Sequence, residues 1–390
     1  MLELIKEIIE RFGGRSAGSS QEREAQLFFK EKLKEFCSDV RVHEFSSALT
    51  GWMGSLKFFC AILYFNLILF WISIPVATLL SVANAVFFIG HFAAYRDWLD
   101  FLFPKLKSLN ITGVLEPQEE AKSTIIVSGH IDSVFEFKWW YKLKQFGATL
   151  SVLSGFLFVL LALFFLILFA AGYNASALPT WSKIVWFGFL AISPILVTLF
   201  NIHGKNVVDG AIDNLSGVAV AFGVGKEFAD SASFGKSTLL NTRLKLVSFG
   251  CEEAGLRGAK AYVEDHLEEM RNEKAILLNV DGIKEKKELR ILTGETWTLV
   301  KYPQDLIEKV EESFIACNVP VIKTGLHVGA TDSSAFAWKN IPAVGLIGMT
   351  SDVLDPCYHT RLDVVENLNP DGIESLKEVL VHFINQWDKK

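Results

Sequence analysis

Long uncharged stretches interrupt a chain that otherwise alternates between amphipathic and strand-like segments. No charged side chain occurs in residues 58–95. At about 1.5 Å of helix per residue, this stretch is just long enough to cross a hydrocarbon core of about 30 Å twice. Ser73 and Pro75 lie at its middle, where a turn is needed. The pattern therefore predicts a transmembrane helical hairpin at residues 54–96.

A second hydrophobic region begins about fifty residues after the first one ends. Residues 147–171 and 184–201 are apolar, and the polar turn GYNASALPTWSK separates them. The second of these helices is short and contains Pro194, which disfavours a continuous helix. We expect a second transmembrane hairpin at residues 147–202. For the first hairpin, at residues 58–95, a pair of helices buried in a soluble core is the alternative, but such helices seldom run this long without a charge.

The remaining segments alternate predicted strands with amphipathic helices. Leu2, Ile5, Ile9 and Phe12, for example, recur at helical spacing. Strands are predicted at residues 40–45, 111–117, 123–132, 244–250, 275–283, 288–294, 319–325 and 343–349. Helices are predicted near residues 21–36, 215–229, 256–269, 303–316 and 370–387, the last capped by Asn369. This alternation predicts an α/β fold with a mostly parallel mixed sheet covered on both faces, a three-layer α/β/α sandwich.

The two hairpins divide this sandwich into three parts along the chain. The expected parts are residues 1–50, residues 108–144 and residues 205–390, with the hairpins between them. Eight basic residues flank the hairpins on the sandwich side, and Lys183 alone lies on the other side. The eight are Lys57, Arg96, Lys105, Lys107, Lys138, Lys142, Lys144 and Lys205. The positive-inside rule then predicts a multi-pass integral membrane protein with a cytoplasmic catalytic domain.

Composition supports a lipid environment and excludes some kinds of partner. Hydrophobic residues make up 51% of the chain, and the mean hydropathy is positive, +0.31, which is unusual for a soluble protein of this size. The net charge is -6 and no basic run occurs, so we expect the lipid bilayer and no nucleic acid as a partner. Five scattered cysteines without a CxxC pair indicate neither a disulfide framework nor a cysteine zinc site.

Five short segments contain nearly all the acidic and histidine residues that lie just after predicted strands. The segments are SGHIDSV, DGAIDNLSG, SFGCEEAGLRGA, LNVDGI and DPCYHTRLD. Their candidate site residues are His130, Asp132, Asp213, Glu252, Glu253, Asp281 and His359. Loops after strands are where α/β proteins bind ligands, and this mixture of imidazole and carboxylate suits a two-zinc site. Taken singly, each residue also has a structural interpretation, such as a helix cap for Asp213.

The ordered set of motifs resembles the co-catalytic zinc aminopeptidases. Relatives of that group include glutamate carboxypeptidase, glutaminyl cyclase and the transferrin-receptor ectodomain. RFGGRSAGS and GATDSSAFAWKNIPAVGL in this chain resemble two further stretches of the family. The resemblance implies two zinc ions and the zinc-peptidase type of sandwich, and Asp213 matches the carboxylate that bridges both ions. The other ligands that it implies form one pair for each ion: His130 with Asp281, and Glu253 with His359.

The resemblance also implies roles for two further carboxylates. Glu252 matches the general base, which takes a proton from the attacking water and passes it to the leaving amine. If the chain is extended there, neighbouring side chains point apart, so Glu253 can bind metal while Glu252 faces the water. Asp132 is expected to accept a hydrogen bond from the second ring nitrogen of His130 and to fix its tautomer.

We therefore expect a membrane-bound zinc exopeptidase, most simply an aminopeptidase acting on peptides, including hydrophobic or membrane-derived ones. Two alternatives keep the same fold: a carboxypeptidase or dipeptidase, and a single-zinc enzyme like glutaminyl cyclase. Arg257 is a candidate for binding a substrate carboxylate in the first of these, unless it is a surface arginine. A non-catalytic membrane scaffold or receptor is the alternative from another class. Relatives of that kind lose ligands, whereas this chain retains every one.

Overall fold

The chain forms two compact units in its computed structural model, which describes residues 1–230, 232–349 and 354–389. The sandwich unit comprises Met1–Leu49, Lys105–Glu136 and Asn206–Lys390. The helical unit comprises Thr50–Pro104 and Phe137–Lys205. Each unit is therefore assembled from segments that are far apart in the sequence.

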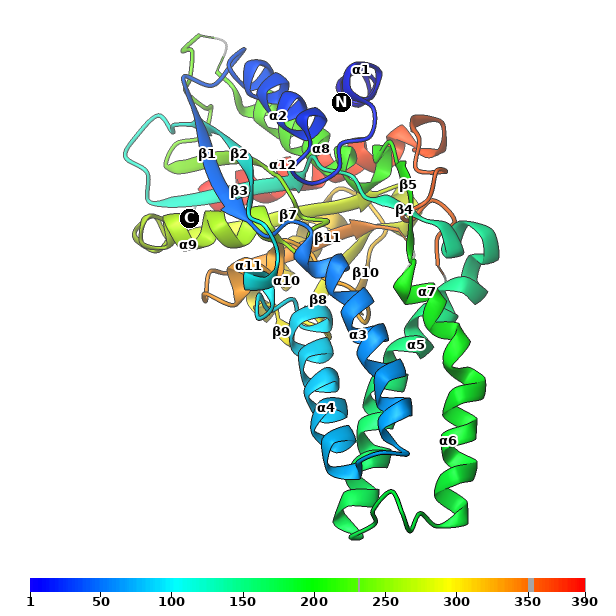
Figure 1. The fold of residues 1–390 in the computed structure, drawn as a ribbon. Helices are drawn as coiled ribbons and strands as arrows, with labels where there is room; N and C mark the ends of the chain where they lie inside the picture. The colour runs from blue at the N-terminus through cyan, green and yellow to red at the C-terminus, as the bar shows by residue number, and fades with distance from the viewer. Residues whose placement is uncertain (231, 350–353, 390) are drawn as a thin grey trace. The chain divides into compact units, whose positions relative to one another are not determined.

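In the described part of the sandwich unit, nine strands form one mixed sheet (Figure 1). Its order is β1-β2-β6-β3-β7-β11-β8-β10, and β9 pairs with β8. The four strands β6, β3, β7 and β11 are mutually parallel, whereas β2 and β8 run antiparallel to them at either side. The bounds are β1 Asp39–Ser47, β2 Leu106–Leu115, β3 Ser123–His130, β6 Thr242–Phe249, β7 Ala275–Ile283, β8 Arg290–Glu295, β9 Val300–Lys301, β10 Ile322–Leu326 and β11 Ala343–Gly348. The predicted mixed sheet of the zinc-peptidase type is confirmed.

Helices cover both faces of this sheet. One face carries α1 (Leu2–Phe12), α2 (Ser20–Leu33), α8 (Ser216–Phe228), α10 (Gln304–Ala316) and α12 (Pro370–Asp388). The other face carries α9 (Arg257–Asn272) and the short α11 (Ser333–Ala337). Alternation along β6 shows the division. Lys245 pairs with Glu269 of α9 and with Glu273 at its C-cap, while Leu246 packs toward α8. The predicted cap of α12 is also present, since Asn369 accepts the backbone amide of Asp371 at 3.1 Å.

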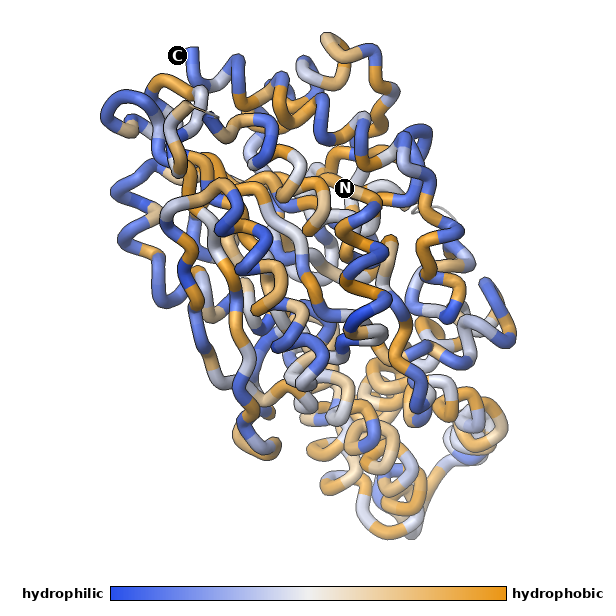
Figure 2. The backbone as a smooth tube through the Cα atoms, turned by 90° about the horizontal axis from the view of Figure 1, so that it is seen from above, coloured by the Kyte–Doolittle hydropathy of each residue, from blue (hydrophilic) through white to orange (hydrophobic). Residues whose placement is uncertain are grey.

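The helical unit contains four helices that are long and apolar enough to cross a membrane. They are Gly51–Leu69 (α3), Ile74–Ala93 (α4 to Phe87 and a following turn), Lys138–Ala170 (α5) and Thr180–Phe200 (α6 to Ile192, then α7, Val197–Phe200). Between 28% and 50% of each span is buried within the fold. Hydrophobic residues predominate along these helices, whereas hydrophobic and hydrophilic residues alternate along the helices of the sandwich unit (Figure 2).

One detail of the helical unit differs from the sequence prediction, and a second follows from Pro194 as expected. Helix α5 begins at Lys138 rather than at residue 147, and its backbone breaks at Lys144, whose φ is 52°. The fourth span is interrupted by a tight turn at Ser193–Leu196, because Pro194 has no amide to continue the helical hydrogen bonding. The chain leaves the sandwich unit through β4 (Phe135–Phe137) and returns through β5 (His203–Val207), which pair as a two-stranded ribbon. The sequence patterns did not predict this ribbon.

Candidate metal centre

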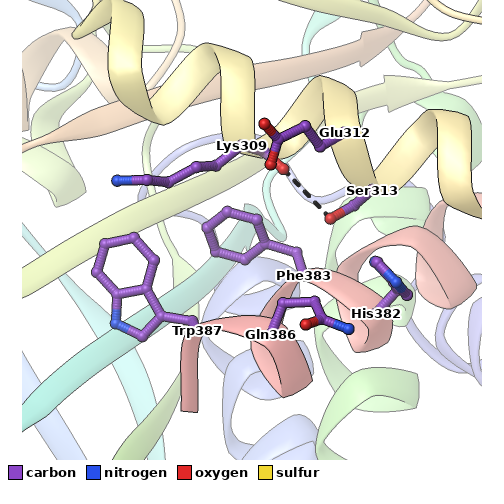
Figure 3. A pocket seen from close by; sticks show the side chains of 7 residues that line it. All are labelled: Lys309, Glu312, Ser313, His382, Phe383, Gln386 and Trp387. Carbon is purple, nitrogen blue, oxygen red and sulfur yellow. Dashed lines mark hydrogen bonds between the residues drawn. The ribbon is translucent and has the colours of Figure 1, made fainter. Parts of the chain in front are cut away.

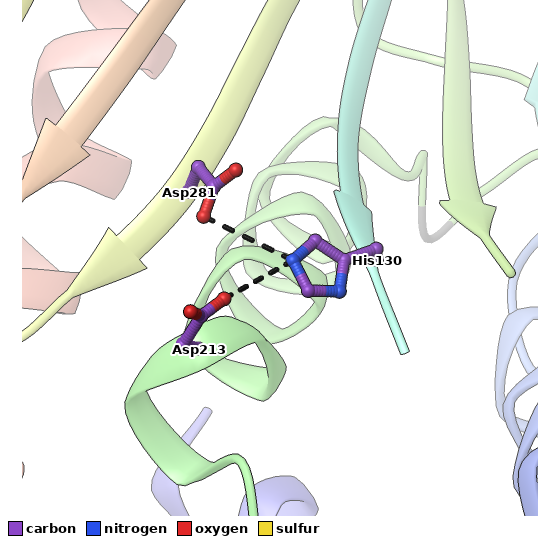
Figure 4. A group of neighbouring side chains, drawn as sticks. All are labelled: His130, Asp213 and Asp281. Carbon is purple, nitrogen blue, oxygen red and sulfur yellow. Dashed lines mark ion pairs between the residues drawn. The ribbon is translucent and has the colours of Figure 1, made fainter. Parts of the chain in front are cut away.

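The ends of neighbouring parallel strands place two of the expected ligands together. His130 is the last residue of β3, and Asp281 lies near the end of β7, its parallel neighbour. Asp213 comes from the irregular segment Ala211–Leu215, which leads into α8. Helix α8 packs on both strands, so Asp213 faces the strand ends (Figure 4). His130 Nε2 lies 3.1 Å from Asp213 Oδ1 and 3.9 Å from Asp281 Oδ1.

Asp213 also belongs to a second cluster. Its other oxygen, Oδ2, lies 3.3 Å from Nε2 of His359, and that nitrogen lies 3.4 Å from Oε1 of Glu253. In each cluster the three potential ligand atoms lie within 4.8 Å of one another. One carboxylate therefore directs its two oxygens at two different histidines. This is the arrangement required of a group that bridges two cations.

Glu252 lies beside these clusters and belongs to neither of them. Its Oε2 is 3.8 Å from His130 Nε2. Glu252 and Glu253 do not lie on extended chain, as the sequence argument assumed. They start a turn in which the Glu252 carbonyl accepts the amides of Gly255 and Leu256, both at 2.8 Å. The two side chains are separated by this turn rather than by strand alternation.

Asp132 is placed as expected but makes different hydrogen bonds. Nδ1 of His130 lies 3.1 Å from the Asp132 carbonyl oxygen and 3.4 Å from its Oδ1. Both acceptors favour a proton on Nδ1, which leaves Nε2 for a metal. The Asp132 carboxylate accepts the backbone amides of Glu252 and Glu253, each at 3.0 Å. Asp132 therefore positions three candidate site residues at once.

Two further residues position the site, and sequence reasoning missed them. The Asp363 carboxylate accepts the amides of Ile212 and Asp213 at 2.6 and 3.1 Å, as Asp132 does for the two glutamates. The buried Arg15 guanidinium donates to the carbonyl oxygens of Ile131, Gly13 and Asp209. Both residues lie inside motifs that sequence reasoning had singled out, RFGGRSAGS and DPCYHTRLD. A role was assigned from the sequence to His359 in the second of these motifs and to no residue of the first.

The electrostatics indicate a site that lacks positive charge. Burial raises the pKa of Glu252 and of Glu253, and neighbouring carboxylates add to this effect. Burial and the Asp213 charge raise the pKa of Asp281 to about 7. Burial opposes ionisation of Asp213, but hydrogen bonds from His130 and His359 outweigh it and lower its pKa. These carboxylates crowd around two imidazoles, those of His130 and His359.

The donor set fits divalent metal ions. Glu253 Oε1 is buried and accepts no hydrogen bond from the described residues, so it remains available as a ligand. Asp332, in the second stretch that resembled the family, is fully buried, and neither carboxylate oxygen has a hydrogen-bond partner among the described residues. Buried carboxylates without partners are costly unless a cation compensates them. Imidazole nitrogen and carboxylate oxygen, three protein ligands for each ion, suit zinc.

A small cavity of about 50 Å³ lies elsewhere in the sandwich unit, between α10 and α12 (Figure 3). Lys309, Ser313, Phe383 and Trp387 are among its lining residues. The Ser313 hydroxyl donates to the Lys309 carbonyl oxygen at 3.3 Å, within one helix. None of the candidate metal ligands lines this cavity, so it is not part of the metal centre.

Comparison with known families finds a match in the second half of the chain. Residues 198–384 match the model of peptidase family M28. The match includes Asp213, Glu252, Glu253, Asp281 and His359, whereas His130 and Asp132 precede it and join the site through the fold. The M28 family uses zinc, in agreement with the two clusters of potential ligands.

Solved structures show the same fold at low sequence identity. The zinc aminopeptidase BSAP from Bacillus subtilis aligns over 99% of this chain and 94% of its own, with a TM-score of 0.57 and 13% identity. The Legionella pneumophila LapA aminopeptidase aligns over 100% of this chain and 71% of its own, with a TM-score of 0.56 and 12% identity. A Porphyromonas gingivalis glutaminyl cyclase aligns over 99% of this chain and 96% of its own, with the same TM-score and identity. A search of curated protein sequences finds no match. Aminopeptidases and a glutaminyl cyclase thus share the fold of this chain.

Proposed function

We propose that this protein is a membrane-bound, two-zinc aminopeptidase. One observation carries the proposal: Asp213 presents Oδ1 to His130 and Oδ2 to His359, at 3.1 and 3.3 Å. His130 and Asp281 would hold one zinc ion, and Glu253 and His359 the other, with Asp213 between them. Bound zinc would act as a Lewis acid on the scissile carbonyl group and make water a better nucleophile.

Glu252 is the general base in this proposal. It is the carboxylate beside the clusters that neither cluster uses, and its Oε2 lies 3.8 Å from His130 Nε2. Burial and neighbouring carboxylates raise its pKa, which favours holding a proton between its removal from water and its delivery to the leaving amine. Asp132 supports this role by holding the Glu252 amide, and so the start of the side chain, in place.

The charge of the site favours substrates with a free amino terminus. Burial raises the pKa values of three carboxylates, those of Glu252, Asp281 and Asp332. A nearby ammonium group of the substrate would stabilise the ionised form of each. Arg257, the candidate for recognising a substrate carboxylate, is only 3% exposed, and its Nε donates to the carbonyl oxygen of Ala254. This burial disfavours a carboxypeptidase.

A cyclase with one zinc ion is the second candidate, because glutaminyl cyclases are among the structures that share this fold. Such an enzyme needs one cluster of ligands, whereas this chain retains two that overlap at Asp213. A non-catalytic scaffold or receptor needs neither cluster of ligands. The two clusters therefore support the two-zinc peptidase over both alternatives.

The membrane part of the proposal rests on the helical unit. Four apolar spans and exposed side chains such as Leu79, Ile184 and Phe187 favour lipid as their surroundings. Because both strands of the β4–β5 ribbon join the sandwich unit to these spans, the catalytic residues are tethered to the bilayer. We propose peptide substrates, including hydrophobic and membrane-derived peptides, and a cytoplasmic catalytic unit.

The test is to measure zinc content and substrate class on the purified full-length protein. We expect two zinc ions per chain, release of the first residue from unblocked peptides, and inertness toward the same peptides after N-acetylation. Peptides with an N-terminal glutamine should lose that residue rather than cyclise. One zinc ion with cyclisation would establish the second candidate instead. Equal rates on acetylated peptides would contradict an aminopeptidase.

A further inference from the structure

The start of α5 forms a rigid basic elbow, residues 138–146. The helix breaks at Lys144, whose φ of 52° is in the left-handed region. The chain then folds back so closely that a side chain at Gly147 would lie 2.2 Å from the carbonyl oxygen of Trp139. Glycine is therefore needed at this crossing. The elbow is a distinct structure that precedes the long apolar part of α5.

Hydrogen bonds fix the aromatic side of this elbow. Trp139 Nε1 donates to the carbonyl oxygen of Asn201 at 2.9 Å, and Trp140 Nε1 donates to Ser151 Oγ at 3.2 Å. The Lys138 amide donates to the carbonyl oxygen of Ile202 at 3.1 Å. Both indoles are therefore held at the end of the helical unit where α5 starts and α7 ends. Indole rings with one polar atom prefer the interfacial region of a bilayer.

The elbow also carries basic side chains that are exposed. Lys142 and Lys144 are exposed, and Lys138 stands one helical turn before Lys142. Like charges four residues apart destabilise a helix unless anions compensate them. Residues 137–205 contain five lysines and no aspartate or glutamate, so this segment offers no acidic partner of its own.

Exposed hydrophobic side chains lie among these lysines. Phe146 is 63% exposed and Leu143 is 40% exposed. A surface that alternates cations with exposed apolar groups matches the boundary between lipid headgroups and acyl chains. The charge of the whole unit agrees, with seven lysines and arginines against two aspartates, in a chain whose net charge is -6.

We propose that the α5 elbow binds anionic phospholipid headgroups, with Lys142 and Lys144 contacting lipid phosphates while Leu143 and Phe146 enter the acyl boundary. This inference rests on the membrane location in the proposed function. It adds a preference for a class of lipid, which a helix that merely spans the bilayer does not need.

The experiment compares phosphatidylglycerol with phosphatidylcholine as stabilisers of the full-length protein in detergent micelles. The readout is the lipid concentration that gives half of the maximal rise in thermal midpoint. Phosphatidylglycerol should stabilise the wild-type protein at lower concentration, and added salt should weaken its effect. The double variant Lys142→Gln/Lys144→Gln should need about fivefold more lipid for each lysine removed, roughly 30-fold in all.

Lys183→Gln is the matched control, because Lys183 is exposed at the start of α6, beyond the far end of α5. It should behave as wild type, and the variant Lys142→Arg/Lys144→Arg should keep the preference, which shows that the elbow still folds. Equal stabilisation of the wild type by both lipids would overturn the inference, as would an equally large effect of Lys183→Gln. Release of the protein from membranes by alkaline carbonate would instead refute the membrane location itself.

Discussion

Asp132 accepts the backbone amide of Glu252 at 3.0 Å, although 120 positions separate the two residues along the chain. Its second oxygen accepts the amide of Glu253 at the same distance. The strand that ends in His130 is thereby joined to the turn that carries both glutamates. By accepting these two hydrogen bonds, the buried Asp132 carboxylate fixes the backbone at Glu252 and Glu253. It thereby determines the positions from which their side chains extend.

Replacing Asp132 by asparagine should therefore damage the site without removing a proposed ligand. One oxygen becomes an amide nitrogen, which cannot accept the N–H that it faces. We expect turnover or zinc affinity to fall by about 10- to 100-fold, the usual effect of changing a group that orients metal ligands. Steady-state kinetics and zinc titration check this, with Asp305→Asn on the surface of α10 as the control. An unaltered rate and zinc affinity would refute the positioning role.

The two central carboxylates should fail in different ways. Glu252→Gln should retain zinc and lose turnover by a factor on the order of 10² or more, because the proton acceptor is gone. Asp213→Asn should lose both zinc ions, because the proposed bridging group can no longer serve two cations. Metal analysis together with kinetics on the same preparations separates the two results. If Glu252→Gln lost its zinc but kept its rate per bound ion, the roles of Glu252 and Glu253 would be reversed.

Glu22 of α2 should make stability depend on pH. Burial, followed by the charge of Asp132, raises its pKa to about 8. The folded state then holds a proton that the unfolded state releases near pH 4.5, so this contribution is full below about pH 4.5 and is lost as pH rises to about 8. Glu22→Gln should remove this pH-dependent loss of stability. As pH rises, the variant should therefore become more stable than the wild type by up to about 1.4 kcal/mol per pH unit. Thermal midpoints between pH 5 and pH 8, with a chelator present, measure the gap.

The exposed Glu31 on the same helix supplies the control for that experiment. Glu31→Gln should leave the pH profile of the thermal midpoint as it is in the wild type. A gap between Glu22→Gln and wild type that stays constant with pH would mean that Glu22 does not change its protonation in this range.

Glu136 and Arg361 should stabilise the loop that carries His359. Glu136 belongs to the ribbon strand β4, and its carboxylate pairs with Arg361 through Nε and Nη2 at 2.7 and 2.8 Å. Because Arg361 follows His359 by two residues, breaking this pair should loosen that ligand and speed zinc loss to a chelator. Glu136→Gln, Arg361→Gln and the double variant should show similar rates, with a coupling of about 1 kcal/mol.

The exposed ion pair of Arg271 and Glu268 gives a control for this double-mutant cycle. Arg271→Gln removes an exposed ion pair on α9 and should not change zinc loss. Additive effects of the two substitutions at Glu136 and Arg361 would show that the pair does not act as a unit.

The proposed topology can be measured by labelling introduced cysteines in sealed vesicles. Ser176→Cys lies between the third and fourth spans, and Lys389→Cys lies at the end of α12. With four spans, an impermeant reagent added outside should label only one of these positions. Labelling of both from the same side would mean that the fourth helix, interrupted at Pro194, does not cross.

Sequence motifs singled out residues that the fold brings together, but they did not predict the residues that support them. His130 and Asp213 could be singled out because they lie in short motifs that resemble a known family. Asp363 and Arg15 act through backbone amides and carbonyls of distant segments, and such contacts leave no periodic pattern. The sequence also left open whether Arg257 is a surface residue or binds a substrate carboxylate. Arg257 is buried in the folded unit.

Fold elements followed a similar rule. Long strands such as β3 and β7 were predicted because they are buried on both faces and read as continuous apolar runs. The three-residue strand β4 carries no alternation to detect, and its partner β5 is assembled from polar residues. The break of α5 at Lys144 also escaped prediction, since lysine gives no local signal for a positive φ.

The excursion of the chain between His130 and Asp213 has a consequence for biosynthesis. Asp213, Glu253, Asp281 and His359 all follow the fourth span in the sequence, and both hairpins are made before any of them. A ribosome that feeds this chain into a membrane therefore anchors the protein before it has synthesised the residues that complete the metal centre. Under the proposed topology, a nascent chain has no working peptidase until its location has been decided. Under the proposed function, this order of translation would prevent proteolysis by chains that have not yet been anchored.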